Sequence, residues 1–183
     1  MPRNGWTDCM TSEVKVGIGS EQPRWMLCIA NRPELDKFQH ETFTTLKLGE
    51  AAEIIQQTSN HWRKLFSIMA KISFALFETG CDTWQQYRDT KLLTAEGFET
   101  ISFEPVQEVS RNAVPCIVAG FTYADTQVDL AQFLPLENDA KVLCRPGSNI
   151  VVTPYFDWRQ LTNAILENVI LVIEAKVKAS PTQ

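Results

Sequence analysis

The segment RWMLCIANRP, residues 24–33, indicates the fold class of this chain. A continuous apolar run follows Arg24 and ends at the polar pair Asn31 and Arg32, just before Pro33. Apolar runs without alternation are typical of strands that are covered on both faces, as in a parallel sheet between helices. The segment therefore predicts a buried strand whose carboxyl end carries polar side chains.

Two further runs have the same character, VPCIVA at residues 114–119 and NIVVT at residues 149–153. Pro115 must lie where the sheet needs no backbone N–H donor. We expect shorter strands at residues 100–103 and 141–144.

Amphipathic segments separate these runs. Apolar residues recur at steps of three and four through residues 61–77, after the cap candidates Ser59 and Asn60, which predicts a core helix. Shorter helices are expected at residues 50–57 and 123–128 and after Asp82 as a cap. For the last helix, Asp157 stands three residues before Gln160, a spacing that predicts Asp157 as its N-cap.

Buried strands that alternate with amphipathic helices predict a three-layer α/β/α domain with a mainly parallel sheet. We expect residues 1–22 to form a flexible N-terminal segment, residues 23–178 a single domain and residues 179–183 a flexible tail.

The composition indicates a soluble globular protein, since 44% of the residues are hydrophobic and 21% are charged. No apolar run approaches the roughly 20 residues that cross a bilayer, and residues 1–20 lack the apolar stretch of a secretory signal. The five cysteines are widely spaced without a CxxC pair, which is typical of reduced thiols. We therefore expect a cytoplasmic protein that has no membrane contact, metal or other cofactor.

A net charge of −5 and a pI of about 5.1 argue against extensive nucleic-acid binding. Arg63, Lys64 and Lys71 could form a local basic stripe, but a solvated helix face is the simpler interpretation.

Several catalytic motifs are absent, among them GxxxxGK[ST], HExxH and GxSxG, and Gly17-Ile18-Gly19 lacks the third glycine of a dinucleotide fingerprint. Of the two histidines, His40 lies in a polar stretch and is expected at the surface. His61 lies in the first turn of a predicted helix, where a structural role is the simpler expectation.

Two loops that follow predicted strands, residues 31–34 and 154–159, are the candidate site. Ligands of α/β proteins bind at the carboxyl ends of strands, so these loops converge if their strands are neighbours. Asn31 has the donor and acceptor that can read a nucleobase edge, and Arg32 can bind an anion. Alternatively, Asn31 shapes the turn and Arg32 pairs with an acid, either Glu34 or Asp157.

In the second loop, Tyr155 could stack on a ring, Arg159 could bind an anion, and Asp157 could act as general base in a hydrolytic reaction. Alternatively, Asp157 caps the helix while Phe156 and Trp158 pack in the core. The predicted ligand-binding residues are Asn31, Arg32, Tyr155 and Arg159, with Asp157 as the predicted catalytic residue.

Three segments carry a resemblance: IANRP at residues 29–33, CIVAGFTYA at 116–124 and VVTPYFDWRQL at 151–161. Their order resembles the uracil-DNA glycosylase-like superfamily, in which a GxxP motif comes first and a PHPS motif precedes the last helix. The resemblance implies a parallel sheet between helices and a ligand related to a nucleobase.

The motif positions carry over as follows: Ala30 on the glycine, Arg32 on the Asp/Asn/Ala position, Pro33 on the proline, Tyr155 on the histidine, Phe156 on the second proline and Asp157 on the serine. Neither the water-activating acid nor the histidine that supports the leaving base is kept. The resemblance therefore implies that glycosylase-type catalysis is lost.

The strings IANRPEL, NHWRK and PYFDWRQL are also similar to an uncharacterised family of proteobacterial proteins with no assigned activity. We thus expect a cytoplasmic protein that binds a nucleobase-containing or other planar anionic ligand. The alternative is a non-enzymatic interaction module whose aromatic loop, residues 154–159, docks a protein partner, because aromatic residues and arginine are common interface anchors. The sequence leaves enzymatic activity open.

Overall fold

The computed structural model describes residues 14–109 and 113–180. The strands are β1 (Gly17–Gly19), β2 (Trp25–Cys28), β3 (Phe43–Thr44), β4 (Glu99–Ser102), β5 (Cys116–Ala119), β6 (Leu134–Leu136), β7 (Asp139–Cys144) and β8 (Ile150–Thr153). The helices are α1 (Glu50–Gln57), α2 (Asn60–Leu76), α3 (Trp84–Thr90), α4 (Val106–Val109), α5 (Phe121–Gln127) and α6 (Asn163–Ala179), with short 3₁₀ turns η1 (Asp36–Phe38) and η2 (Leu130–Gln132).

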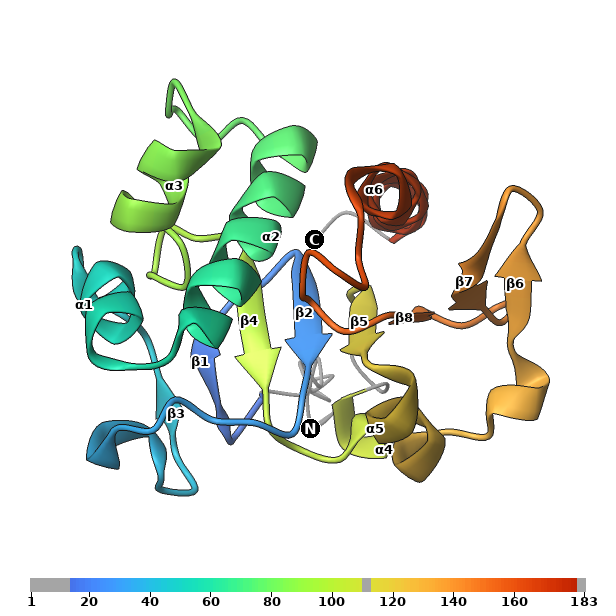
Figure 1. Cartoon of the computed structure of the whole chain (residues 1–183), viewed down its shortest axis with the longest axis horizontal. Coiled ribbons are helices and arrows are strands. Elements are labelled where there is room, and N and C mark those ends of the chain that lie inside the picture. Colours follow the sequence, from blue (N-terminus) through green and yellow to red (C-terminus); the bar gives the residue numbers. More distant parts are fainter. Residues whose placement is uncertain (1–13, 110–112, 181–183) are drawn as a thin grey trace, which may run out of the picture.

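The strands form one sheet in the order β3-β1-β4-β2-β5-β8-β7-β6 (Figure 1). Its centre, β4-β2-β5-β8, is parallel, whereas β1, β7 and β6 join through antiparallel pairs. The predicted α/β class with a mainly parallel sheet is therefore confirmed.

The central strands are buried on both faces, as their continuous apolar runs predict. In β2, Trp25 and Leu27 belong to one hydrophobic cluster, while Met26 and Cys28 belong to another on the opposite face. The first cluster includes side chains of α1, α2, α3 and α6, and the second includes side chains of α4 and α5. This arrangement gives the predicted three layers.

The start of the last helix differs from the prediction. Helix α6 begins at Asn163, and its N-cap is Thr162, whose hydroxyl accepts from the amide of Ile165 at 3.5 Å. The backbone carbonyl of Asp157 instead accepts from the amides of Gln160 and Leu161, at 2.9 and 2.8 Å, in a turn before the helix. The prediction of Asp157 as the helix cap is wrong. Likewise, Thr83 and not Asp82 caps α3.

The sheet includes residues that we expected to precede the domain. Strand β1 lies within residues 1–22 and pairs antiparallel with β4, and its Ile18 is buried. A three-residue strand that begins and ends with glycine has a single apolar side chain, which is too short a pattern to be recognised from the sequence. Residues 1–13 and 181–183, which cover most of the expected flexible ends, lie outside the described residues.

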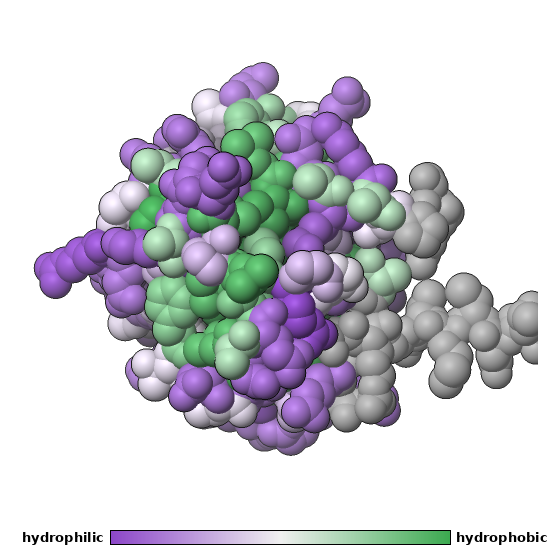
Figure 2. Space-filling model, turned by 90° about the vertical axis from the view of Figure 1, so that its right-hand side faces the viewer, coloured by the Kyte–Doolittle hydropathy of each residue, from purple (hydrophilic) through white to green (hydrophobic). Residues whose placement is uncertain are grey.

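One side of the molecule is more apolar than its surroundings. Figure 2, which faces the β6–β7 hairpin, shows apolar side chains gathered in one area. Among the exposed large apolar side chains, Leu134 of β6 and Leu171 of α6 are each 60% exposed. In the described part of the chain, no helix is both long and apolar enough to cross a membrane.

A buried carboxyl group joins the elements near the amino end of β4. The Glu99 side chain accepts hydrogen bonds from the Tyr87 hydroxyl at 2.9 Å, from the Leu93 amide at 2.8 Å and from the Ser73 hydroxyl. The indole N–H of Trp25 donates to Ser73 at 2.9 Å. Burial raises the pKa of Glu99, which the hydrogen bonds oppose. The network ties α2, α3, β2 and β4 together.

We expect Glu99→Ala to lower the free energy of unfolding by about 3–5 kcal/mol, because it leaves several buried donors without an acceptor. Glu96→Ala is the matched control, since the Glu96 side chain is 77% exposed and lies 3.7 Å from Lys91; we expect a change within about 0.5 kcal/mol. Urea-induced unfolding followed by circular dichroism measures both. Equal effects of the two substitutions would show that Glu99 does not stabilise the fold as described.

Candidate functional site

The carboxyl ends of β2, β5 and β8 lie side by side, because these three strands are adjacent and parallel. The chain leaves β2 toward helices on one face of the sheet and leaves β5 toward α5 on the other. Such a point of divergence at the carboxyl edge is where open α/β sheets bind ligands. The loops that begin here contain Asn31, Gly120 and Tyr155.

Tyr155 contacts His61, which lies in the first turn of α2. The tyrosine hydroxyl lies 2.7 Å from Nε2 of His61. The two rings are nearly parallel, with an interplanar angle of 14° and centroids 5.2 Å apart. Both side chains are half-buried. Residues 94 positions apart thus form a polar aromatic pair at the sheet edge.

Asn31 completes this pair through a hydrogen bond with the Tyr155 side chain. Burial raises the pKa of Tyr155, while the bond to Asn31 lowers it. A donor to the phenol oxygen has this lowering effect because it stabilises the phenolate. The Tyr155 hydroxyl also shares a hydrogen bond with Nε2 of His61, in which the hydroxyl donates when the imidazole is neutral and protonated on Nδ1.

This direction fits a neutral imidazole. Burial lowers the pKa of His61, and the charge of Lys64 acts in the same sense, against the opposing charge of Asp157. A neutral histidine that accepts at Nε2 carries its proton on Nδ1. Among the described residues, the Tyr155 hydroxyl is the hydrogen-bond partner of the His61 ring. That hydroxyl lies 2.7 Å from Nε2 and 3.5 Å from Nδ1, so Nδ1 is the ring nitrogen that is more open to a ligand.

A charge pair lies next to this histidine. Lys64 Nζ and Asp157 Oδ2 are 2.7 Å apart, and their side chains are 27% and 25% exposed. The hydrogen bond from Lys64 lowers the pKa of Asp157, as does the amide of Arg159, which donates to Asp157 Oδ1 at 2.9 Å. Asp157 is therefore an ionised acceptor that orders its own loop.

Gly120 leaves room for the Tyr155 ring. Its φ of +96° favours glycine, and a Cβ there would lie 3.3 Å from Cδ2 of Tyr155. The glycine between β5 and α5 thus lets the backbone approach the face of the tyrosine.

The structure brings together Asn31 and Tyr155 of the predicted ligand-binding residues, and Arg159 lies close enough to Asp157 to affect its pKa. Arg32 has other partners: it donates to Glu41 at 2.8 Å and to the carbonyl of His40 at 3.2 Å. Its guanidinium also lies 5.3 Å from the centroid of the Phe103 ring. Arg32 therefore pairs with an acid, as the alternative interpretation has it, but with Glu41.

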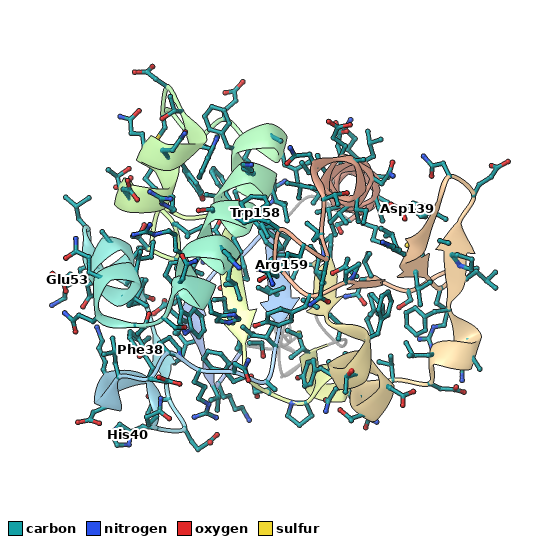
Figure 3. All side chains as sticks on the ribbon, in the orientation of Figure 1. Phe38, His40, Glu53, Asp139, Trp158 and Arg159 are labelled. Atoms are coloured by element: carbon teal, nitrogen blue, oxygen red, sulfur yellow. The ribbon has the colours of Figure 1, made fainter. Side chains whose placement is uncertain are left out.

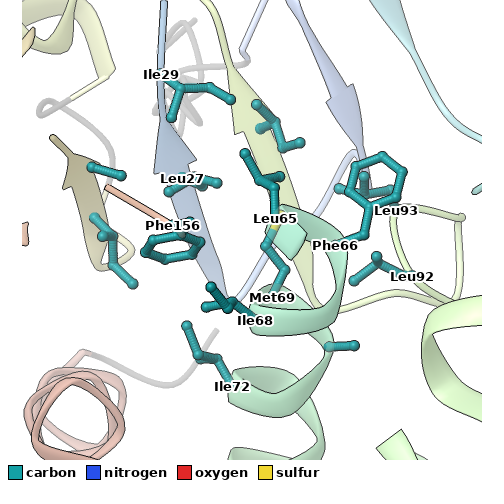
Figure 4. Packing of buried hydrophobic residues seen from close by; sticks show 14 of the residues in the cluster. Leu27, Ile29, Leu65, Phe66, Ile68, Met69, Ile72, Leu92, Leu93 and Phe156 are labelled. Atoms are coloured by element: carbon teal, nitrogen blue, oxygen red, sulfur yellow. The ribbon is translucent and has the colours of Figure 1, made fainter. Parts of the chain in front are cut away.

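The other aromatic residues of the loop hold it in place. Phe156 is fully buried and lies over Leu27 of β2 (Figure 4), which confirms its predicted packing role. Trp158 is only half-buried, and the ammonium group of Lys71 lies 4.3 Å from its ring centroid. Figure 3 shows Trp158 and Arg159 on the side of the sheet that carries α2 and α6.

Sequence reasoning missed His61 as a member of this site. Helix α2 follows α1 and not a strand, so the order of elements gave no local signal that its first turn reaches the carboxyl edge.

Among the described residues, neither a group of metal ligands nor either of the two cavities described below lies at this edge. In the described ranges, His, Cys, Asp and Glu side chains form no group of three or more that could hold a metal ion. Cavities of about 180 and 210 Å³ lie elsewhere, one between η1 and α1 and the other beside Arg24 and the ends of α2 and α6. The candidate site is thus a surface formed by loops.

Searches of curated proteins and of solved structures found no match to this chain. They give no support to the resemblance to uracil-DNA glycosylases. One family model matches residues 16–174, a stretch that includes the whole sheet and the candidate site. The expectation of an uncharacterised family is confirmed: the chain belongs to a family of unknown function, DUF6942.

Proposed function

We propose that this protein binds a small planar anionic ligand, such as a nucleobase-containing molecule, at the carboxyl edge of β2, β5 and β8. The observation that carries the proposal is the meeting of Asn31, Tyr155 and His61, which come from three distant parts of the chain. Ligands of open α/β folds bind at this kind of edge.

The free thiols among the described residues support the proposed cytoplasmic location.

The chemistry of these groups suits such a ligand. Tyr155 and His61 offer aromatic surface for a planar ring. The Asn31 amide and the Nδ1–H of His61 offer directional hydrogen bonds to polar ring atoms or to an anionic oxygen. Arg159, which is exposed, supplies positive charge beside them. The predicted role of Arg32 requires its guanidinium to leave Glu41 when the ligand binds.

A hydrolytic reaction at this site would need a general base. Asp157, the predicted base, has its pKa lowered by Lys64, which makes it a weaker base. His61 is neutral above its lowered pKa, and its Nε2 can accept a proton once the Tyr155 hydroxyl no longer donates to it. Base excision by the glycosylase mechanism is no part of the proposal, because Arg32 and Tyr155 occupy the positions of its acid and histidine.

A thermal-shift screen tests the proposed binding. We expect nucleoside monophosphates to raise Tm more than uncharged nucleobases, because their phosphate can bind the positive charge of Arg159. A ligand at about 100 times its Kd stabilises a protein by about 2.7 kcal/mol. Tyr155→Ala and Arg159→Ala should each weaken binding about tenfold. Arg145→Ala, an exposed arginine on another part of the chain, is the matched control and should leave binding unchanged. A screen without any stabilising nucleotide, nucleobase or planar carboxylate would contradict the proposal.

Gly120 provides a second test, because a methyl group there would press on the Tyr155 ring. We expect Gly120→Ala to weaken binding of the strongest screened ligand about tenfold and to cost roughly 1 kcal/mol or more of stability. Gly147→Ala is the control, since Gly147 also has a positive φ, +73°, but a Cβ there meets nothing within 4 Å. Calorimetric titration measures the affinities. Equal affinities of the two variants for the ligand would show that Gly120 is not part of the binding site.

The pKa of His61 predicts a pH dependence of stability. Because its folded-state pKa lies below the ordinary value of 6.5, its contribution is fully present above that value and is lost as the pH falls through the lowered pKa. Unfolding free energies at pH about 7.5 and about 5 should therefore differ less in His61→Asn than in the unchanged protein. His40→Asn, which replaces the other, exposed histidine, should keep the original difference. A similar loss in both variants would rule out His61 as the source.

A further inference from the structure

A cationic and aromatic surface lies further along α2, beside the loop between β8 and α6. The Lys71 ammonium lies 4.3 Å from the centroid of the Trp158 ring and 5.1 Å from that of Trp84 on α3. The Arg88 guanidinium lies 5.6 Å from the Trp84 centroid. All four side chains are half-buried. Two indole rings thus hold one ammonium group where it still reaches solvent.

The cations of this area exceed the nearby carboxylates that pair with them. Lys64 pairs with Asp157 and Arg88 with Asp89. Arg63, Lys71 and Arg159 have no ion pair with a carboxylate in residues 14–109 and 113–180. The chain as a whole carries a net charge of −5, so a locally positive area stands out against an acidic molecule.

We propose that Trp84, Lys71, Trp158 and Arg159 form a docking surface for an acidic segment of a partner protein. A carboxylate of the partner accepts from the Lys71 ammonium, while the indole rings offer apolar area. Tryptophan and arginine are enriched among the residues that dominate binding at protein interfaces. Complementary charge then selects an acidic partner.

Two observations favour a protein segment over a single-stranded nucleic acid. The protein's own cations already lie over both indole rings, whereas single-strand binding needs rings open for base stacking. The acidic remainder of the molecule also repels a long polyanion. The surface shares Arg159 with the proposed ligand site, but its central cation, Lys71, lies ten residues, or about 15 Å, from His61 along α2, and the inference does not depend on the proposed function.

The test uses poly-L-glutamate as the probe and follows the indole N–H signals of the full-length chain by NMR. We expect the signals of Trp84 and Trp158 to shift on titration, and Lys71→Met, which keeps the apolar stem, to weaken binding at least tenfold. Lys141→Met is the matched control: it removes the same charge from the exposed Lys141 of β7 and should change the affinity by less than twofold.

Arg159→Met is a second variant at an exposed position, should Lys71→Met fail to fold, and a severalfold loss of affinity is expected there. An oligothymidylate of 15 nucleotides is titrated in parallel. The inference is overturned if the oligonucleotide binds more tightly than poly-L-glutamate, if neither probe shifts the two indole signals, or if the Lys71 and Lys141 variants lose affinity equally.

Discussion

Burial of both faces of the central parallel strands is the constraint on which the rest of the structure depends. Side chains of β2, β5 and β8 alternate between two hydrophobic clusters that helices cover on each side. A ligand cannot reach the bodies of such strands, because water and polar groups are excluded there. Chemistry is therefore confined to the ends of the strands and to the loops that follow them.

The same burial orients the loop after β8. Phe156 is fully buried against β2, and burying a phenylalanine side chain contributes about 1.5–3 kcal/mol. The partly exposed ion pair of Asp157 with Lys64 contributes less, about 0–1 kcal/mol. Phe156 is thus the main anchor of the loop. Its neighbour Tyr155 remains half-buried and meets His61 at the edge of the sheet.

Local sequence patterns predicted most helices and strands correctly. The predictions that failed concern features that depend on contacts between distant parts of the chain. The apolar runs located β2, β5 and β8, and the spacing of apolar residues located α1 and α2, because those signals lie within single segments. The cap of α6 was missed because Asp157 has the local features of a cap but binds Lys64, 93 residues away. The helix therefore begins later in the chain, at Asn163, with Thr162 as its N-cap.

The positions of the candidate site residues in the fold were predicted to the same extent and for the same reason. The positions of Asn31 and Tyr155 after buried strands are local facts, so their convergence followed from the parallel order of β2, β5 and β8. The partner of Arg32 and the part played by His61 depend on which distant segments fold together. A single sequence does not record this.

Satisfaction of polar groups separates the part of this protein that maintains the fold from the part that can act on a ligand. Glu99 has no exposed surface, and its oxygens accept from Ser73, Tyr87 and Leu93, so the group is closed to another molecule. His61 is half-buried, and Tyr155 engages its Nε2. Its Nδ1 is the ring nitrogen farther from the Tyr155 hydroxyl, at 3.5 Å, and lies on a side chain that a ligand can reach. His61 is thus an ionisable group at the carboxyl edge of the sheet, where the loops leave it accessible. A ligand that binds there can change the protonation state of His61 without disturbing the hydrophobic core.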